Sequence, residues 1–379
     1  MREKYAAFNR REFLAAATAA AAGLALPRSA LAEAPLAVGF IYSGPKNDLG
    51  YNQAHFEGRM ALKELPWVKV IDQGNVPETV AAEEAMRDMI HEDGVKAVFA
   101  TSYGHLDPYV FRVARESPDV QFFHCGGYYI PGVHPPNIGV YFGAIDEVEY
   151  LAGMTAGLVT RTGRLGFVAA KPIPQVLRNI NSYLLGARSV RPSATMKVIF
   201  TGDWVLPVRE AEAASSLADE GADVLTGHTG SPRAIVQVAE RRGIWATGFQ
   251  FNQSVVAPRG FLTGAEWSWG VVYRQYAEWI RAGRSLAGGT LPHRVTGMLK
   301  DNFCRLSSFG PAVTPQMANH VLAAEQELLA GTRSVYTGPL RNNRGQLVIS
   351  AGKTIRIEDP SLNGMNWLLE GIEGDINSL

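Results

Sequence analysis

Short apolar segments alternate with helical patterns along the chain from Ala37 onward, and the alternation starts afresh in the second half. Short apolar strands with helices between them predict a parallel sheet covered on both faces. Two successive series therefore predict an α/β protein with two similar, doubly wound lobes. The expected strands are residues 37–42, 69–72, 97–101 and 121–125, then 164–169, 197–201, 223–225 and 244–248. The expected helices are residues 53–64, 80–92, 108–116, 147–160, 175–190, 211–220, 234–242, 269–282 and 315–330, with a tight turn at 342–345.

The length and net charge of the chain limit its domain organisation and the partners it can bind. Its 379 residues exceed what one core usually serves, in agreement with two lobes. The formal net charge is +0, so the chain lacks the electrostatic footprint of a nucleic-acid-binding protein, and we expect no nucleic-acid partner. Five basic and two acidic side chains lie in residues 1–32, so residues 33–379 keep 31 basic and 34 acidic side chains and a net charge of −3.

The first 32 residues have the pattern of an export signal. Four basic residues among the first eleven precede an alanine-rich apolar stretch at 13–26, and small residues at 29–32 form an A-x-A cleavage site. Residues 9–14 read NRREFL, which adds the twin-arginine pattern of bacterial export. The apolar stretch is shorter than the roughly 20 residues that a membrane span needs. We therefore expect cleavage after Ala32 and a periplasmic location.

Motifs of several enzyme classes are absent from the sequence. There is no GxGxxG after the first strand, no GxxxxGK[ST], no GxSxG, no HExxH and no paired CxxC. We expect neither an enzyme nor a cofactor, and no metal site. The two cysteines, Cys125 and Cys304, either form one disulfide, which an oxidising compartment permits, or remain buried thiols.

The first strand ends in a loop that carries polar and aromatic side chains. Asn47, Asp48, Tyr51 and Asn52 follow the strand at 37–42. Ligands of open α/β sheets sit outside the carboxyl ends of the strands, where such a loop lies. A ring, a carboxylate and an amide so close together suit a small, flat, polar ligand better than a phosphate. Alternatively, Asp48 caps the following helix through backbone N–H groups.

Several segments in order resemble the basic membrane protein (Bmp) family of ABC-importer substrate-binding proteins, which is related to purine nucleoside receptors. The loop SGPKNDLGYNQAHFEG has the family's aspartate and its aromatic–asparagine pair, here Asp48 and Tyr51-Asn52. The other matching segments are ATSYGHLDP (100–108), EYLAGMTAGL (149–158), PIPQVLRNINSYLLGARSVRP (172–192), residues 219–254, and YTGPLRNNRGQLV and MNWLLEGIEG in the tail.

This resemblance implies the type I periplasmic binding protein fold, with two lobes, three hinge crossings and the ligand in the cleft. It implies a monomeric receptor that binds a purine base or nucleoside and delivers it to an ABC permease. The crossings are expected near residues 143–146, 264–267 and 294–306. The expected lobes are residues 33–145 with 266–298, and residues 146–265 with 299–379.

Two departures from the family pattern concern ribose. Nucleoside-binding members have a GxDxDQ pattern whose first aspartate holds the ribose hydroxyls, whereas residues 248–253 read GFQFNQ, with Gln250 in that place. A lysine expected shortly afterwards is replaced by Trp267, within the sequence EWSW. This pattern resembles a subgroup suited to free purine bases.

The ligand ring is expected to stack between Tyr51 and either Trp204 or Trp267, because base–aromatic stacking contributes about 1–3 kcal/mol. Only one of Trp267 and Trp269 should face the cleft, and we favour Trp267. Structural roles remain open: loop packing for Trp204, the helix surface for Asn181 and a purely structural place for His228. The polar or rim candidates are Asp48, Asn52, Tyr103, Asn181, His228 and Gln250.

Binding of another ligand class, or an enzymatic function, would require other residues in the site. A sugar site also uses aromatic stacking, so Tyr51 alone does not separate it from a purine site. An amino-acid site needs a cation for the ligand carboxylate, and Arg178 is the nearest one. A nucleoside hydrolase would need a carboxylate cluster and usually a metal, whereas the opening loop supplies only Asp48.

Overall fold

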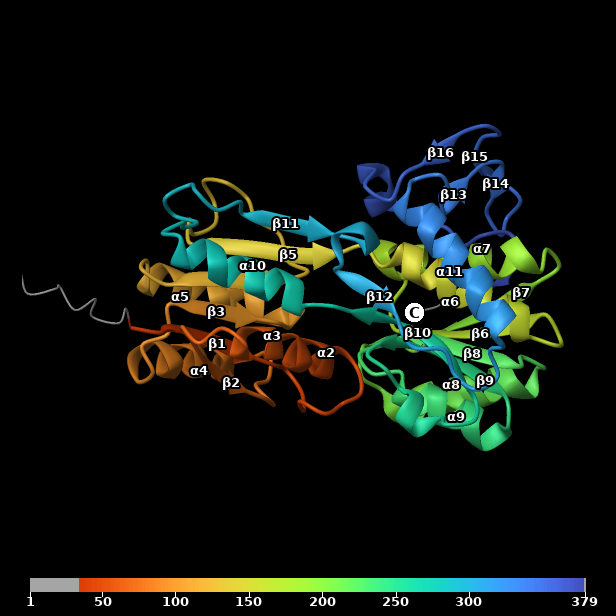
Figure 1. The fold of residues 1–379 in the computed structure, drawn as a ribbon, viewed down its shortest axis with the longest axis horizontal. Coiled ribbons are helices and arrows are strands. Elements are labelled where there is room, and N and C mark those ends of the chain that lie inside the picture. Colours follow the sequence, from red (N-terminus) through yellow and green to blue (C-terminus); the bar gives the residue numbers. More distant parts are fainter. Residues whose placement is uncertain (1–33, 378–379) are drawn as a thin grey trace, which may run out of the picture. The chain divides into compact units, whose positions relative to one another are not determined.

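The computed structural model describes residues 34–377, and the first of its two large sheets has six strands (Figure 1). The strand order is β11-β5-β4-β3-β1-β2, and all neighbours run parallel. The export signal expected at 1–32 lies outside the described residues. The strands of this sheet are β1 (Leu36–Ile41), β2 (Val68–Gln73), β3 (Ala97–Ala100), β4 (Gln121–Cys125), β5 (Ile138–Gly143) and β11 (Arg294–Gly297).

The second sheet has seven strands in the order β12-β10-β9-β8-β6-β7-β17. Only the β10–β12 pair in this sheet is antiparallel. Its strands are β6 (Arg164–Ala169), β7 (Thr195–Phe200), β8 (Val224–His228), β9 (Trp245–Gln250), β10 (Phe261–Trp267), β12 (Cys304–Leu306) and β17 (Ile372–Glu373). Two small antiparallel pairs lie in the tail, β13 (Tyr336–Thr337) with β16 (Thr354–Ile355) and β14 (Leu340–Arg341) with β15 (Leu347–Ile349).

Helices cover both faces of the first sheet, and apolar clusters fill the space between. On one face Met86 of α4 joins Val98 and Phe122 of the sheet in one cluster. On the other face Tyr273 of α10 lies edge-on to Phe99, with ring centroids 4.7 Å apart. We call each sheet with its helices a lobe. The first lobe has α2 (Tyr51–Gly58), α3 (Met60–Lys63), α4 (Val80–His91), α5 (Phe111–Glu116) and α10 (Gly270–Arg281); the second has α6 (Asp146–Val159), α7 (Pro174–Val190), α8 (Pro207–Asp219), α9 (Arg233–Arg242) and α11 (Pro315–Leu329).

The two series of strands and helices predicted from the sequence are confirmed. Strands β4 and β6 have the predicted bounds, whereas β5 at Ile138–Gly143 was not predicted. The helix expected at 53–64 is interrupted at Arg59 and forms α2 and α3. The helix expected at 211–220 begins earlier, at Pro207, a residue favoured in the first turn of a helix. The lobe ranges given above stay a prediction, since residues 36–379 form one unit by their contacts.

The chain passes between the lobes three times, from β5 to α6, from β10 to α10 and from β11 to β12. The first and third passages lie within the expected ranges 143–146 and 294–306. The second was expected at 264–267 and lies further along the chain. Residues 264–266 pair in register with β9, so the chain leaves the second sheet only after Trp267.

Both cysteines are buried free thiols, so the disulfide alternative is not realised. Burial raises the pKa of the Cys125 thiol to about 12. Among residues 34–377, no helix is long and apolar enough to cross a membrane. Within the same residues, no group of three or more histidine, cysteine or acidic side chains could hold a metal ion.

Helices α6 and α7 pack with almost no space between their backbones. A Cβ atom on Gly153 would lie 1.9 Å from the carbonyl oxygen of Tyr183, and one on Gly186 would lie 1.8 Å from that of Tyr150. Gly157 repeats the contact further along, where a Cβ would lie 2.6 Å from a carbonyl oxygen of α7. These glycines therefore allow the close packing of α6, which begins directly after the first passage between the lobes.

Gly153→Ala should lower the free energy of unfolding by about 2 kcal/mol, because the added methyl group forces the two helices apart. Alanine's better helix propensity, about 1 kcal/mol, offsets only part of this cost. Urea unfolding measures the change. Gly364→Ala is the matched control, since a Cβ there would have no atom within 4 Å. Equal stability of the two variants would contradict the packing described here.

Candidate ligand-binding site

Asp48 organises the loop between β1 and α2. Its carboxylate accepts hydrogen bonds from the backbone N–H groups of Gly50 (2.8 Å), Asn52 (3.1 Å) and Gln53 (2.9 Å). It also accepts one from Nδ2 of Asn52 at 2.9 Å. Asp48 was expected either to contact the ligand or to cap the helix, and these bonds show that it caps the helix. The Oδ1 atom of Asn52 accepts from the Gly44 N–H at 3.2 Å, so both side chains are engaged within the loop.

Tyr51 begins α2 and lies against the carboxyl end of the first sheet. Its hydroxyl donates to the carbonyl oxygen of Thr101, just after β3, at 2.6 Å. Its ring meets His55 edge-on, with centroids 4.5 Å apart. Burial, aided by the neighbouring Cys125, raises the pKa of Tyr51 well above its ordinary value. The hydroxyl therefore stays protonated and holds the ring in one orientation.

His228 ends β8 in the second lobe, and it is buried. Its ring contacts Phe249 at 4.3 Å and Trp204 at 6.0 Å between centroids. Asn179 donates through Nδ2 to Nδ1 of His228 at 3.0 Å, which assigns the hydrogen of the neutral ring to Nε2. Burial lowers the pKa of His228 to about 3, so the ring is neutral at physiological pH and has one N–H donor.

Gln250 and Trp267 lie side by side on neighbouring strands. The indole Nε1–H of Trp267 donates to Oε1 of Gln250 at 2.7 Å. Nε2 of Gln250 donates to the carbonyl oxygen of Thr229 at 3.1 Å, so both ends of the amide are engaged. Trp267 stacks on Trp269 with centroids 4.6 Å apart. Trp269 is fully buried and Trp267 is 6% exposed, and both belong to the same apolar cluster, so the expectation that only Trp267 faces the cleft stays a prediction.

Two further candidates lie in loops at the carboxyl ends of the strands. Tyr103 follows β3 in the short 3₁₀ turn η1 (Tyr103–His105) and is 65% exposed. Trp204 follows β7, and its carbonyl oxygen accepts from the Gly230 N–H at 2.7 Å. The backbone of Trp204 is thus joined to the glycine-containing loop after β8.

Asn181 and Arg178 lie elsewhere, on the face of α7 that holds the tail. Asn181 is buried rather than on the helix surface, and it accepts from the Leu369 N–H at 2.8 Å and donates to the carbonyl of Trp367 at 3.0 Å. Arg178 makes a two-pronged ion pair with Asp146, at 2.7 and 3.0 Å. Its charge is therefore neutralised inside the protein.

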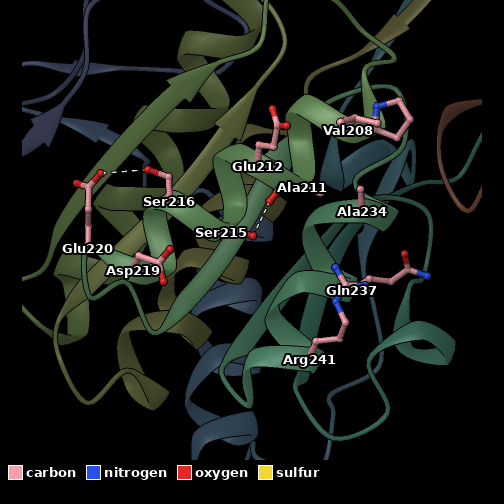
Figure 2. Close-up of a pocket in the computed structure, with 11 residues that line it drawn as sticks. Val208, Ala211, Glu212, Ser215, Ser216, Asp219, Glu220, Ala234, Gln237 and Arg241 are labelled. Carbon is pink, nitrogen blue, oxygen red and sulfur yellow. Dashed lines mark hydrogen bonds between the residues drawn. The ribbon is translucent and has the colours of Figure 1, made fainter.

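A surface groove lies between α8 and α9, and Figure 2 shows its lining. None of the candidate residues lines it. Ser215 donates to the carbonyl of Ala211 at 2.8 Å, and Ser216 donates to Glu220 at 3.3 Å. These hydroxyls are thus satisfied by α8 and the residue that follows it, and the groove is not built from the residues that the sequence singles out.

A family model described as an ABC transporter substrate-binding protein, PnrA-like, matches residues 36–301. The chain belongs to this Bmp family. A purine-binding protein of Brucella abortus is 34% identical over 94% of this chain and 98% of its own. A protein of Haloferax volcanii that is named for glucose binding in an ABC transporter is 31% identical over 89% of this chain and 81% of its own. The Bmp family comprises solute-binding proteins of transporters rather than enzymes.

Solved structures of ABC solute-binding proteins share the fold of this Bmp protein. One from Conexibacter woesei has a TM-score of 0.65 and 24% identity, and the match covers 79% of this chain and 97% of that one. One from Aeropyrum pernix has a TM-score of 0.63 and 17% identity, and the match covers 81% and 93%. The predicted fold, two doubly wound α/β lobes of the type I periplasmic binding protein class, is therefore confirmed.

Some residues that shape the site were not predicted from the sequence. Asn179 sets the tautomer of His228, and His55 supports the ring of Tyr51. Gln253 is fully buried and bonds to the loop of Asp48. The spacing of His55, four residues after Tyr51 on one helix face, was the available signal. The role of Gln253 depends on a contact between segments about 200 residues apart. Its available signal was that it keeps the final position of the family's GxDxDQ pattern.

Asp48→Ala should lower the free energy of unfolding by about 1 kcal/mol, because the backbone N–H groups of Gly50, Asn52 and Gln53 at the start of α2 lose their acceptor. Thermal melting of the ligand-free protein measures this. Asp93→Ala is the control, since Asp93 pairs only with the exposed Lys69 and such pairs contribute about 0–1 kcal/mol. If Asp48→Ala leaves the melting temperature unchanged, the capping role is wrong.

Proposed function

We propose that this Bmp protein is a periplasmic receptor for a purine base, which it binds between its lobes and delivers to an ABC permease. The site would be formed by Tyr51 from the first lobe, and by His228, Gln250 and Trp267 from the second. Tyr51 and Trp267 would supply the aromatic surfaces, and the neutral His228 would donate to an acceptor nitrogen or oxygen of the ligand. The purine-binding relative supports this choice of ligand.

The observation that carries the proposal is the engagement of the charged candidates. The carboxylate of Asp48 accepts four hydrogen bonds inside its own loop. The guanidinium of Arg178 is paired with Asp146. A ligand with a free carboxylate or ammonium group would lack a counter-ion from either residue, and an unpaired buried charge is costly. This favours a neutral, flat ligand over an amino acid.

The hydrogen bonds already made by the Gln250 side chain favour the free base over the nucleoside as the ligand. This residue occupies the place where the family pattern has an aspartate for ribose. Its Oε1 and Nε2 atoms are already bonded to Trp267 and Thr229. Both ends of the Gln250 amide are therefore occupied, so neither is free to bond a ribose hydroxyl. The indole of Trp267 also fills the space beside the amide.

A sugar is the second candidate, supported by the relative named for glucose binding. A sugar is also neutral and also stacks on aromatic side chains. It differs from a purine in offering hydroxyl groups around its whole edge, which need many donors and acceptors. A direct comparison of ligands therefore separates the two.

Adenine or guanine should raise the melting temperature of the purified mature protein more than adenosine, guanosine or glucose at the same concentration. A ligand that binds only the native state stabilises it by mass action, by about 2.7 kcal/mol at a hundred times its Kd. Differential scanning fluorimetry compares the five compounds directly. A larger shift with a nucleoside would overturn the exclusion of ribose, and a larger shift with glucose would overturn the purine assignment.

Tyr51→Ala should weaken adenine binding roughly tenfold, the low end of the stacking range. Tyr51→Phe is the matched control, because it keeps the ring and removes only the hydroxyl that bonds to Thr101. Isothermal titration calorimetry gives both affinities. Unchanged affinity in Tyr51→Ala would remove this ring from the site.

The proposed periplasmic location is supported by the export signal expected at 1–32 and by the family's transport role. Solute capture outside the inner membrane is what an ABC importer requires of its binding protein. Fractionation of cells tests the location. Recovery of the cleaved chain in the soluble periplasmic fraction supports it, whereas retention in the membrane after cleavage contradicts it.

A further inference from the structure

Three hydrogen bonds join the loop before α2 directly to the second lobe. The Tyr51 N–H donates to the carbonyl oxygen of Gly230 at 2.8 Å. The Ser231 hydroxyl donates to the carbonyl oxygen of Asp48 at 2.5 Å. The Gln253 side chain donates through Nε2 to the carbonyl oxygen of Leu49 at 2.6 Å. We call these residues the interlobe latch.

Gly50 stands at the closest point of the latch. A Cβ atom on it would lie 2.3 Å from the carbonyl oxygen of Gly230, and 2.7 and 2.8 Å from Cα and Cβ of Ser231. These three nearest atoms all belong to the second lobe. The closest obstacles to a side chain at position 50 are therefore atoms of the second lobe.

Backbone strain is found at the same contact. Within residues 34–377, four residues other than glycine have positive φ, and two of them are asparagines, which tolerate that conformation. The other two are Leu49, with φ 54°, and Gln250, with φ 76°. Leu49 presents its carbonyl to Gln253, and Gln250 bonds to Thr229 beside Gly230. Such strained residues persist only where their surroundings hold them, and they concentrate at functional sites.

The bonds of the latch need no ligand, since each joins protein to protein. Hinge closure is the motion by which binding proteins of this fold enclose their ligands. We propose that Gly50, Ser231 and Gln253 are positioning residues that hold the two lobes together directly, so that the ligand-free protein already populates the closed form and a bound ligand leaves slowly. The apparent affinity for a ligand rises with the populated fraction of the competent form.

Single-molecule energy transfer between the lobes tests the latch. Dyes are attached to Glu84→Cys on α4 and Glu212→Cys on α8, two exposed positions, while Cys125 and Cys304 are buried. In the absence of ligand, Gly50→Ala should shift molecules from the high-transfer closed form to the open form. The control Gly364→Ala, where a Cβ meets nothing within 4 Å, should match the parent protein.

With adenine as the probe, Gly50→Ala should raise the dissociation rate about tenfold and change the association rate little, as is usual for changes within one binding surface. Ser231→Ala, which removes one hydroxyl and adds no atom, should change both readouts in the same direction by less. It also keeps the test valid if Gly50→Ala does not fold. Equal ligand-free transfer distributions in the parent, Gly50→Ala and Ser231→Ala would overturn the proposal. The ligand-free measurement decides the latch even if adenine does not bind, a result that would count against the proposed ligand alone.

Discussion

The backbone hydrogen bond from Tyr51 to Gly230 is the contact on which the arrangement of the site depends. It forms only because Gly50 carries no side chain where the two lobes meet. The cap that Asp48 makes on α2 presents this N–H outward, and the same helix start carries the ring of Tyr51. One local structure, a capped helix end with a glycine, thus fixes both the approach of the lobes and the position of the ring.

Some of the polar groups around this contact are already engaged by the protein, which restricts the ligand. The carboxylate of Asp48 holds the loop, and the amide of Gln250 holds the indole of Trp267. The imidazole of His228 is neutral because burial lowers its pKa, so it offers one donor and no charge. A neutral aromatic heterocycle fits such a set of groups better than an ion does.

The local parts of the fold could be predicted from the sequence, and the long-range parts could not. The strand β4 follows from a short apolar run with clear ends, and its bounds agree with the structure. The strand β5 was missed because its two glycines dilute the β pattern of IGVYFG. The strand β17 has two residues and exists only through pairing with β7. No local sequence pattern predicts a strand of this kind.

The candidate site residues also divide into those with a local signal in the sequence and those whose contacts are long-range. Tyr51, Trp267 and His228 were proposed from local signals, a family motif or a place near a strand end, and they stay predictions as ligand-binding residues. The surface position considered for Asn181 is wrong, because the residue is buried against the tail, and these partners lie almost 190 residues away in the sequence. Gln253 was missed for the same reason, since its side chain bonds to a loop in the other lobe. Helix periodicity predicts on which face of a helix a residue lies, but it does not predict which residues pack against that face.

Mass spectrometry tests the purine ligand most directly: the protein is purified from its native compartment without added ligand, and the small molecule released on denaturation is identified. We expect a purine base in near-stoichiometric amount, carried through purification by the closed lobes. Release of a hexose or an amino acid in that amount would contradict the purine assignment.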